Sequence, residues 1–206
     1  EAIEFSVMTY NIAGSYELLD MVANNEFPAD IIGLQEVPRN MSGFGTFSQQ
    51  GGNAIYTEFP KSSEVAEAIY RINNSRYVSA VKREIKIQGQ TVSIYSLHAY
   101  RPSLTLRPFE YLTQPRTEDI QAVANAVAVD PNPVIMFCDC NFSDQSEDYQ
   151  LLTLHLWDAW KEKGVGLGLT ANAPAGGPGF PFLLLRSDYI WHSEEFETLS
   201  IKVLPN

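Results

Sequence analysis

The sequence predicts an α/β protein with two β-sheets that stack on each other and are covered by helices. Short apolar runs rich in Val and Ile recur along the chain, and several of them are followed by segments with helical spacing. The chain has 206 residues, of which 45% are hydrophobic and 19% are charged, as in ordinary globular proteins. This length suits one sizeable domain, so we expect residues 1–206 to form a single domain.

The expected strands are short apolar stretches, several of which end in polar residues. The run at 134–142 follows two prolines and is typical of a buried strand that is covered on both faces. A hairpin turn is expected at Gln88-Gly89-Gln90, between two apolar runs. In chain order, the expected strands cover residues 5–10, 30–36, 54–59, 64–72, 77–87, 91–97, 134–142, 183–192 and 199–204.

Three helices are expected from the spacing of the apolar residues. Ser15 is placed to cap a helix over 16–25. The clearest helix covers 115–129, where apolar residues recur every three or four positions and Thr113 is a possible cap. A shorter helix is expected over 147–156. The segments 41–53, 100–113 and 164–179 are expected to be loops.

The net charge of −11 argues against a protein that holds nucleic acid tightly by bulk charge, because such affinity comes mainly from Lys and Arg. It does not exclude a phosphodiester substrate, since a metal ion and a few arginines supply charge locally. No apolar run approaches the roughly 20 residues that span a bilayer. The chain begins at Glu1 without a leader or a methionine, so we expect a processed piece of an exported or membrane-attached extracytoplasmic protein. A monomer is expected.

The two cysteines, Cys138 and Cys140, lie two positions apart on one expected strand. Residues at this spacing on a strand are about 6.5 Å apart, which is near the outer limit for a disulfide. A metal site would need further soft ligands, and none is evident. We therefore expect two reduced cysteines in the core.

Polar residues end or interrupt several of the expected apolar strands. Asp139 and Asn141 alternate with the cysteines, so their side chains should face one side of the strand end. This is where α/β sheets place ligands, although Asp and Asn also serve as plain turn residues. The complete set of such residues is Asn11, Glu36, His98, Asp139, Asn141 and Asp188.

A shared site is the natural explanation for this set, because buried polar groups need partners. Glu36 and Asp139 offer oxygen donors of the kind that Mg²⁺ or Mn²⁺ prefers. Asparagine amides can hold a phosphate oxygen without adding charge, and His98 can donate to a phosphate oxygen or to a leaving group. Together these residues indicate metal-assisted hydrolysis of a phosphate ester.

Five motifs follow one another along nearly the whole chain. They are Thr9-Tyr10-Asn11, Ile32-Gly33-Leu34-Gln35-Glu36-Val37, Ser96-Leu97-His98, Cys138-Asp139-Cys140-Asn141 and Arg186-Ser187-Asp188-Tyr189-Ile190. In this order they resemble the signatures of the endonuclease/exonuclease/phosphatase (DNase I-like) superfamily. The resemblance implies a four-layer α/β/β/α sandwich of two mixed sheets flanked by helices. It also implies a divalent cation and the hydrolysis of phosphodiesters or phosphomonoesters.

The resemblance also assigns roles to the matched residues. It makes Glu36 the principal metal ligand, with Asn11 beside it. Asp139 would activate or orient the water, and Asn141 would hold the phosphate. His98 would stabilise the developing charge.

In the superfamily, the residue at Asp188 orients a second histidine, which lies in a Ser-Asp-His block on a following strand. This chain ends where that block should begin, so we expect a domain that lacks its last C-terminal strand block. A metal-dependent phosphoesterase is the expected function. The alternative is a weakly active or non-catalytic binding domain that keeps the fold.

Three arginines are candidates for contact with the substrate phosphate. Arg116 matches a position that supports the site in the superfamily, and Arg186 lies within the expected strand of Asp188. Arg101 follows His98 in an expected loop, where a solvated charge is the alternative. The substrate itself stays open among nucleic acid, phospholipid headgroup and sugar phosphate.

Overall fold

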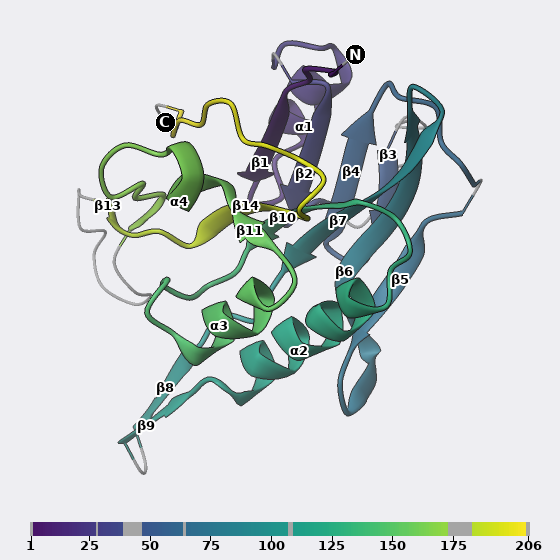
Figure 1. The fold of residues 1–206 in the computed structure, drawn as a ribbon. Helices are drawn as coiled ribbons and strands as arrows, with labels where there is room; N and C mark the ends of the chain where they lie inside the picture. Colours follow the sequence, from purple (N-terminus) through teal and green to yellow (C-terminus); the bar gives the residue numbers. More distant parts are fainter. Residues whose placement is uncertain are drawn as a thin grey trace.

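The computed structural model describes residues 2–27, 29–38, 47–63, 65–106, 109–172 and 183–204. Two mixed β-sheets lie face to face and helices cover their outer faces, which confirms the predicted α/β sandwich (Figure 1). Among the described helices, none is both long and apolar enough to cross a membrane.

The smaller sheet has the strand order β1-β2-β4-β3. Its strands are β1 (Val7–Asn11), β2 (Ile31–Gln35), β3 (Phe47–Gln50) and β4 (Asn53–Thr57). β1 and β2 are parallel, and the other pairs are antiparallel. Helix α1 (Tyr16–Ala23) covers this sheet and begins as predicted, since the Ser15 hydroxyl accepts a hydrogen bond from the Leu18 N–H. Its Leu19 and Val22 are fully buried in the core beneath it.

The larger sheet has the order β11-β14-β10-β7-β6-β5. Its strands are β5 (Glu67–Arg71), β6 (Asn74–Ile87), β7 (Gln90–His98), β10 (Val134–Asp139), β11 (Trp157–Asp158) and β14 (Asp188–His192). Only β7 and β10 are parallel. The predicted hairpin turn joins β6 and β7, with positive φ at Gln88 and Gly89, which suits a tight two-residue turn.

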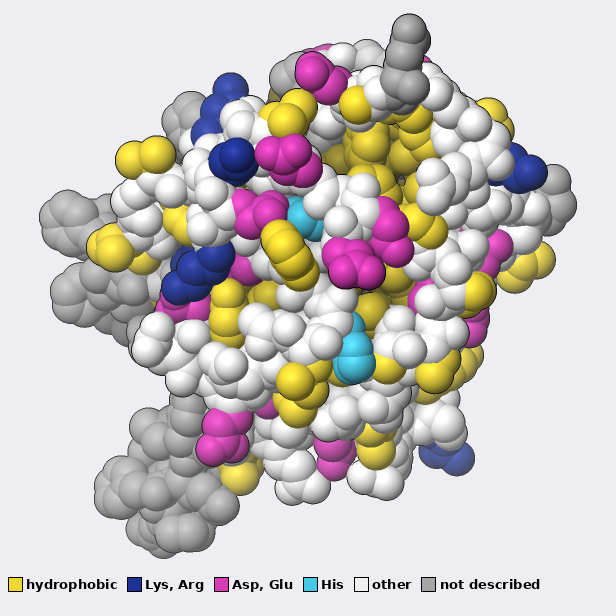
Figure 2. Space-filling view, viewed as in Figure 1, with side chains coloured by type: hydrophobic (Ala, Val, Ile, Leu, Met, Phe, Trp, Pro, Cys, Tyr) yellow, Lys and Arg dark blue, Asp and Glu magenta, His cyan; other side chains and the backbone are white. Residues whose placement is uncertain are grey.

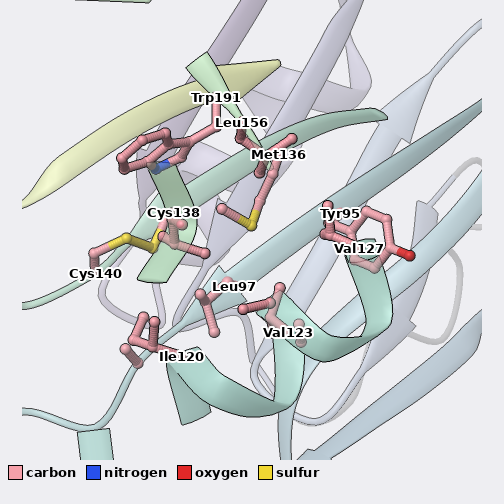
Figure 3. Packing of buried hydrophobic residues seen from close by; sticks show 14 of the residues in the cluster. Tyr95, Leu97, Ile120, Val123, Val127, Met136, Cys138, Cys140, Leu156 and Trp191 are labelled. Atoms are coloured by element: carbon pink, nitrogen blue, oxygen red, sulfur yellow. A yellow bond between two sulfur atoms is a disulfide. The ribbon is translucent and has the colours of Figure 1, made fainter. Parts of the chain in front are cut away.

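Helices α2 (Gln114–Ala128) and α3 (Glu147–Thr153) cover the outer face of the larger sheet. Ile120, Val123 and Val127 of α2 lie at helical spacing and pack against the sheet (Figure 3). Thr113 is the N-cap residue of α2, but its side chain makes no capping hydrogen bond. A short helix α4 (Ala159–Lys163) follows β11.

A third group of apolar side chains fills the space between the two sheets. Phe137 of β10 crosses this space and lies directly against Gly33 of β2. A Cβ atom at residue 33 would meet the Cβ and ring of Phe137 at 2.3 Å. Glycine at this position therefore allows the two sheets to approach each other closely.

Five expectations about secondary structure are wrong. The expected 164–179 loop contains the short strand β12 (Ala171–Asn172). Part of the expected 41–53 loop forms β3, and the expected 100–113 loop contains the hairpin β8 (Ser103–Leu106) and β9 (Phe109–Leu112). The segment 199–204 has no regular secondary structure. The expected strand 183–192 is two strands in different sheets, because the chain turns at residues 186–187. The first of them, β13 (Leu183–Leu185), pairs with β12 (Ala171–Asn172).

The expectation of two reduced cysteines is also wrong, since Cys138 and Cys140 form a disulfide with Cα atoms 5.0 Å apart. The spacing of a fully extended strand does not apply here, because β10 ends at Asp139 and the two Cα atoms are closer than in an extended strand. The Cys140 N–H still donates to the Ser187 carbonyl at 2.8 Å, in register with the pairing of β10 and β14. Both cysteines are fully buried in the core under α2 and α3, in the cluster that includes Trp191 (Figure 3).

Candidate active site

Four predicted side chains meet where strands of both sheets end. Asn11 and His98 are the last residues of β1 and β7, Asp139 is the last residue of β10, and Glu36 directly follows β2. The Asn11 amide Nδ2 donates to Glu36 Oε1 at 3.0 Å and to Asp139 Oδ2 at 2.9 Å. One amide group thus holds two carboxylates together across the two sheets.

His98 completes this cluster from the larger sheet. Its Nε2 atom lies 3.6 Å from Glu36 Oε1 and 3.8 Å from Asp139 Oδ2. One ligand atom from each of Glu36, His98 and Asp139 lies within 4.8 Å of the others.

The second oxygen of Asp139 is buried, and within the described structure it has no hydrogen-bond partner. A buried carboxylate oxygen without a donor is costly, so a cation is the natural partner for it. Two carboxylates and an imidazole are also a donor set that suits a divalent metal ion.

Two site residues have a backbone conformation that residues other than glycine rarely adopt. Glu36 and Asn141 both have φ of 51°. Left-handed backbone at non-glycine residues often accompanies functional sites, because the surrounding structure must hold it in place. Here it turns the chain at the end of β2 and just after β10.

Asn141 is held from two directions. Its side-chain amide Nδ2 donates to the Ala99 carbonyl at 3.0 Å, and its backbone carbonyl accepts from Arg116 Nη1 at 2.9 Å. The Arg116 guanidinium is buried and also donates from Nε to Asp148 at 2.6 Å. This placement favours a supporting role for Arg116 over the predicted contact with substrate phosphate.

Arg186 and Arg101 differ in whether the guanidinium is already paired inside the protein. Arg186 is buried, and both of its terminal nitrogens bond to the Asp158 carboxylate, at 3.0 and 2.7 Å. It braces the chain just before Asp188. Arg101 is exposed, so of the three predicted arginines it is the one whose charge is open to solvent and to a ligand.

Asp188 lies opposite Asp139 in the antiparallel pair of β10 and β14. Burial, together with the nearby charge of Asp139, raises the pKa of Asp188 to about 6, against hydrogen bonds from Thr170 and Ser187. The Ser187 hydroxyl donates to its carboxylate at 3.0 Å. Two carboxyl groups in one buried place favour a proton on one of them.

The sequence did not single out several groups that support the site. The Ala99 carbonyl that holds Asn141 is a backbone atom and leaves no trace in the residue types. Thr170 is distant in sequence and accepts from the Asp188 N–H at 3.1 Å. Gln35 and Ser96, bonded across the sheets at 3.1 Å, belong to the motifs and could have been found from them.

The two flanked sheets and the polar cluster at their shared edge define an α/β sandwich of the DNase I-like class. The chain belongs to the endonuclease/exonuclease/phosphatase family, whose sequence model matches residues 8–206. Members of this superfamily are phosphoesterases and generally use divalent metals. No curated protein matches the chain by sequence.

Solved structures share the fold at low sequence identity. A family protein from Leptotrichia buccalis is 18% identical, with a TM-score of 0.62 over 93% of this chain and 89% of its own. The mannosyl-6-phosphatase of Bacteroides thetaiotaomicron is 15% identical, with a TM-score of 0.64 over 93% and 86%. Truncated Caenorhabditis elegans TDP2 is 22% identical, with a TM-score of 0.61 over 92% and 83%.

Proposed function

We propose that this protein is a divalent-metal-dependent phosphoesterase that acts on phosphodiesters. The observation that carries the proposal is the convergence of Glu36, His98 and Asp139, together with the buried and unpartnered Oδ1 atom of Asp139. Carboxylate oxygens that converge with more acceptor positions than neighbouring donors are what a cation-dependent site requires.

Glu36 and Asp139 would hold the cation, and Mg²⁺ or Mn²⁺ is proposed because the carboxylate oxygens are hard donors. When bound, such an ion supplies positive charge that offsets the charge of the phosphate and of the leaving oxygen. Asn11 keeps the two carboxylates together through its amide hydrogens.

The remaining residues would act on the substrate and on water. Asp139 orients the attacking water and takes up its proton as the P–O bond to the leaving group breaks. His98 donates to a phosphate oxygen where negative charge develops. Asn141 uses one amide hydrogen on Ala99, and its second hydrogen is available to a phosphate oxygen.

A phosphodiester is proposed without a commitment to the group that it carries. Nucleic acid, a phospholipid headgroup and a sugar phosphate all present the same reacting centre. On the face in Figure 2, Asp and Glu side chains form several small groups, and the described residues of this face form no continuous basic stripe. Together with the net charge of −11, this distribution argues against a long duplex held by bulk charge.

The test is hydrolysis of bis(p-nitrophenyl) phosphate, p-nitrophenyl phosphate and plasmid DNA, with Mg²⁺, with Mn²⁺ and with EDTA. We expect turnover of the diester that EDTA abolishes, and that Glu36→Ala or Asp139→Ala abolishes. Glu194→Ala, at an exposed acidic residue outside the cluster, is the matched control and should retain activity. Turnover that survives EDTA or the two site substitutions would sink the mechanism. No turnover of any substrate would favour the non-catalytic binding domain.

We also propose that the protein works outside the reducing cytoplasm. The buried Cys138–Cys140 disulfide supports this, because disulfides persist mainly in oxidising compartments. Thiol labelling of protein recovered under denaturing conditions from its own cells tests the proposal. Two free thiols per chain would contradict it.

A further inference from the structure

Asp119 of α2 is a fully buried carboxylate with donors on several sides. Arg71 of β5 donates to both of its oxygens, from Nε and Nη2, each at 2.7 Å. The Ser79 hydroxyl donates to Oδ1, and the backbone N–H of Tyr100 donates to Oδ2 at 2.8 Å. The last of these bonds joins α2 to the segment that directly follows His98.

The segment 98–100 is bonded to two site residues and to helix α2. The Ala99 N–H donates to the Asp139 carbonyl at 3.0 Å, and the Ala99 carbonyl accepts from the Asn141 amide at 3.0 Å. Tyr100 is then held by Asp119. Because His98 is joined to this segment, its backbone has little freedom to move away from Glu36 and Asp139.

The charge of Asp119 is balanced inside the protein. The Arg71 guanidinium lies 3.8 Å from the ring centre of Tyr77 and 5.0 Å from that of Tyr100. Burial opposes the charged guanidinium, yet the hydrogen bonds and charge of Asp119 raise the pKa of Arg71. The carboxylate of Asp119 is therefore paired with a guanidinium and held by several donors, which makes it a strong and well-oriented partner for the Tyr100 N–H.

We propose that Asp119 is a positioning residue for the reaction: through Tyr100 it fixes the segment that carries His98 and receives Asn141. This inference rests on the proposed function only in its kinetic part. The position of the His98 ring is a property of the folded protein and can be measured without turnover.

Asp130 offers a matched control, because it is also a buried carboxylate that follows the same helix. It accepts from Tyr95 Oη at 2.6 Å and from Ser93 Oγ at 3.0 Å, and it pairs with Lys82 at 3.0 Å. On β7 these contacts are made at Ser93 and Tyr95, in the middle of the strand, and none of them involves the segment 98–100. Asp130→Asn should therefore cost stability without affecting the site.

The experiment compares Asp119→Asn and Asp130→Asn by diester hydrolysis and by the ¹H–¹³C NMR signals of the imidazole rings. The chain has three histidines, so the His98 signal can be assigned by substitution. For Asp119→Asn we expect kcat to fall about 10- to 100-fold while KM changes less than about threefold. The His98 signal should shift, and those of His155 and His192 should not.

A double variant, Arg71→Met with Asp119→Leu, guards against loss of the fold, because apolar residues often replace a buried ion pair without cost. It removes the acceptor of Tyr100, so the His98 signal should shift here too. An unshifted His98 signal in this variant, or an equal loss of kcat in Asp130→Asn, would overturn the proposal. Absence of turnover in the unmodified protein would contradict the proposed function and leave the NMR comparison as the test of positioning.

Discussion

The two sheets supply the site with side chains that are held to different degrees. On the larger sheet, Asn141 is bonded through its carbonyl to Arg116, and the segment after His98 is bonded to Asp119. On the smaller sheet, the described residues that follow β1 and β2 bond to each other, with the Gly14 N–H donating to the Glu36 carbonyl at 2.8 Å and the Ile12 N–H to the Gln35 carbonyl at 3.0 Å.

Exposure follows the same division. The Glu36 side chain is 47% exposed, whereas that of Asp139 is 12% exposed. A site with one fixed side and one open side lets a ligand enter beside Glu36 and meet groups on the other side that are already in position. Variants on the two sides should therefore differ in what they change.

The largest expected effect is on the open side. Glu36→Gln keeps the shape of the side chain but removes its charge, so diester turnover should fall by about 10³-fold or more. Because the side chain is exposed, the unfolding free energy should change by less than about 0.5 kcal/mol. Parallel measurement of turnover and of urea unfolding checks both. A large loss of stability would contradict the division between the sides.

On the fixed side, Arg116→Met should cost stability as well as activity. It leaves the buried Asp148 carboxylate unpaired and removes a donor from the Asn141 carbonyl. Breaking a buried ion pair in this way costs about 3–5 kcal/mol, which chemical denaturation would detect. Arg101→Met, at an exposed arginine, is the control and should unfold like the unmodified protein.

On the larger sheet, the carboxyl group of Asp188 lowers the stability of the folded protein at neutral and alkaline pH. The pKa of Asp188 is raised from 3.8 to about 6 in the folded protein. Between these pH values the folded protein keeps a proton on Asp188 that the unfolded chain has released, so the unfolding free energy falls as the pH rises. Asp188→Asn removes this titration. In EDTA, the unfolding free energy of the variant relative to that of the unmodified protein should therefore be higher at about pH 8 than at about pH 3.5, by roughly 3 kcal/mol. An equal gain at both pH values would show that another cause is at work.

The smallest effect is expected from the disulfide. Replacing Cys138 and Cys140 together with Ala opens a very short loop, for which the chain-entropy estimate is roughly 1.5 kcal/mol. Calorimetric melting of the variant and of the unmodified protein compares the two. A loss far above this value would mean that the disulfide orders the end of β10 by more than loop entropy.

The sequence predicted the fold, and which polar residues come together, where each depends on motifs in order. Asn11, Glu36, His98 and Asp139 were found as strand ends and do come together. The two sheets and their covering helices follow from the same pattern.

The sequence left open where strands end and which charged side chains are paired inside the fold. The disulfide needed β10 to end at Asp139, which apolar periodicity does not reveal. The hairpin of β8 and β9 was missed because prolines and arginines obscured the alternation around Leu104 and Leu106. Arg116 and Arg186 were given to substrate because a sequence does not tell which arginines are already paired inside the fold.

The contact between Gly33 and Phe137 sets the distance between the two sheets, and the candidate site is built from residues of both. Asn11 reaches Glu36 and Asp139 at once only while the two sheets keep their present spacing. A methyl group at residue 33 would act as a wedge in the interior, where Phe137 already fills the room. Every residue of the site could then be intact while the two halves no longer meet. In this fold, a residue in the interior that has no side chain thus determines whether the site residues at the edge of the sheets meet.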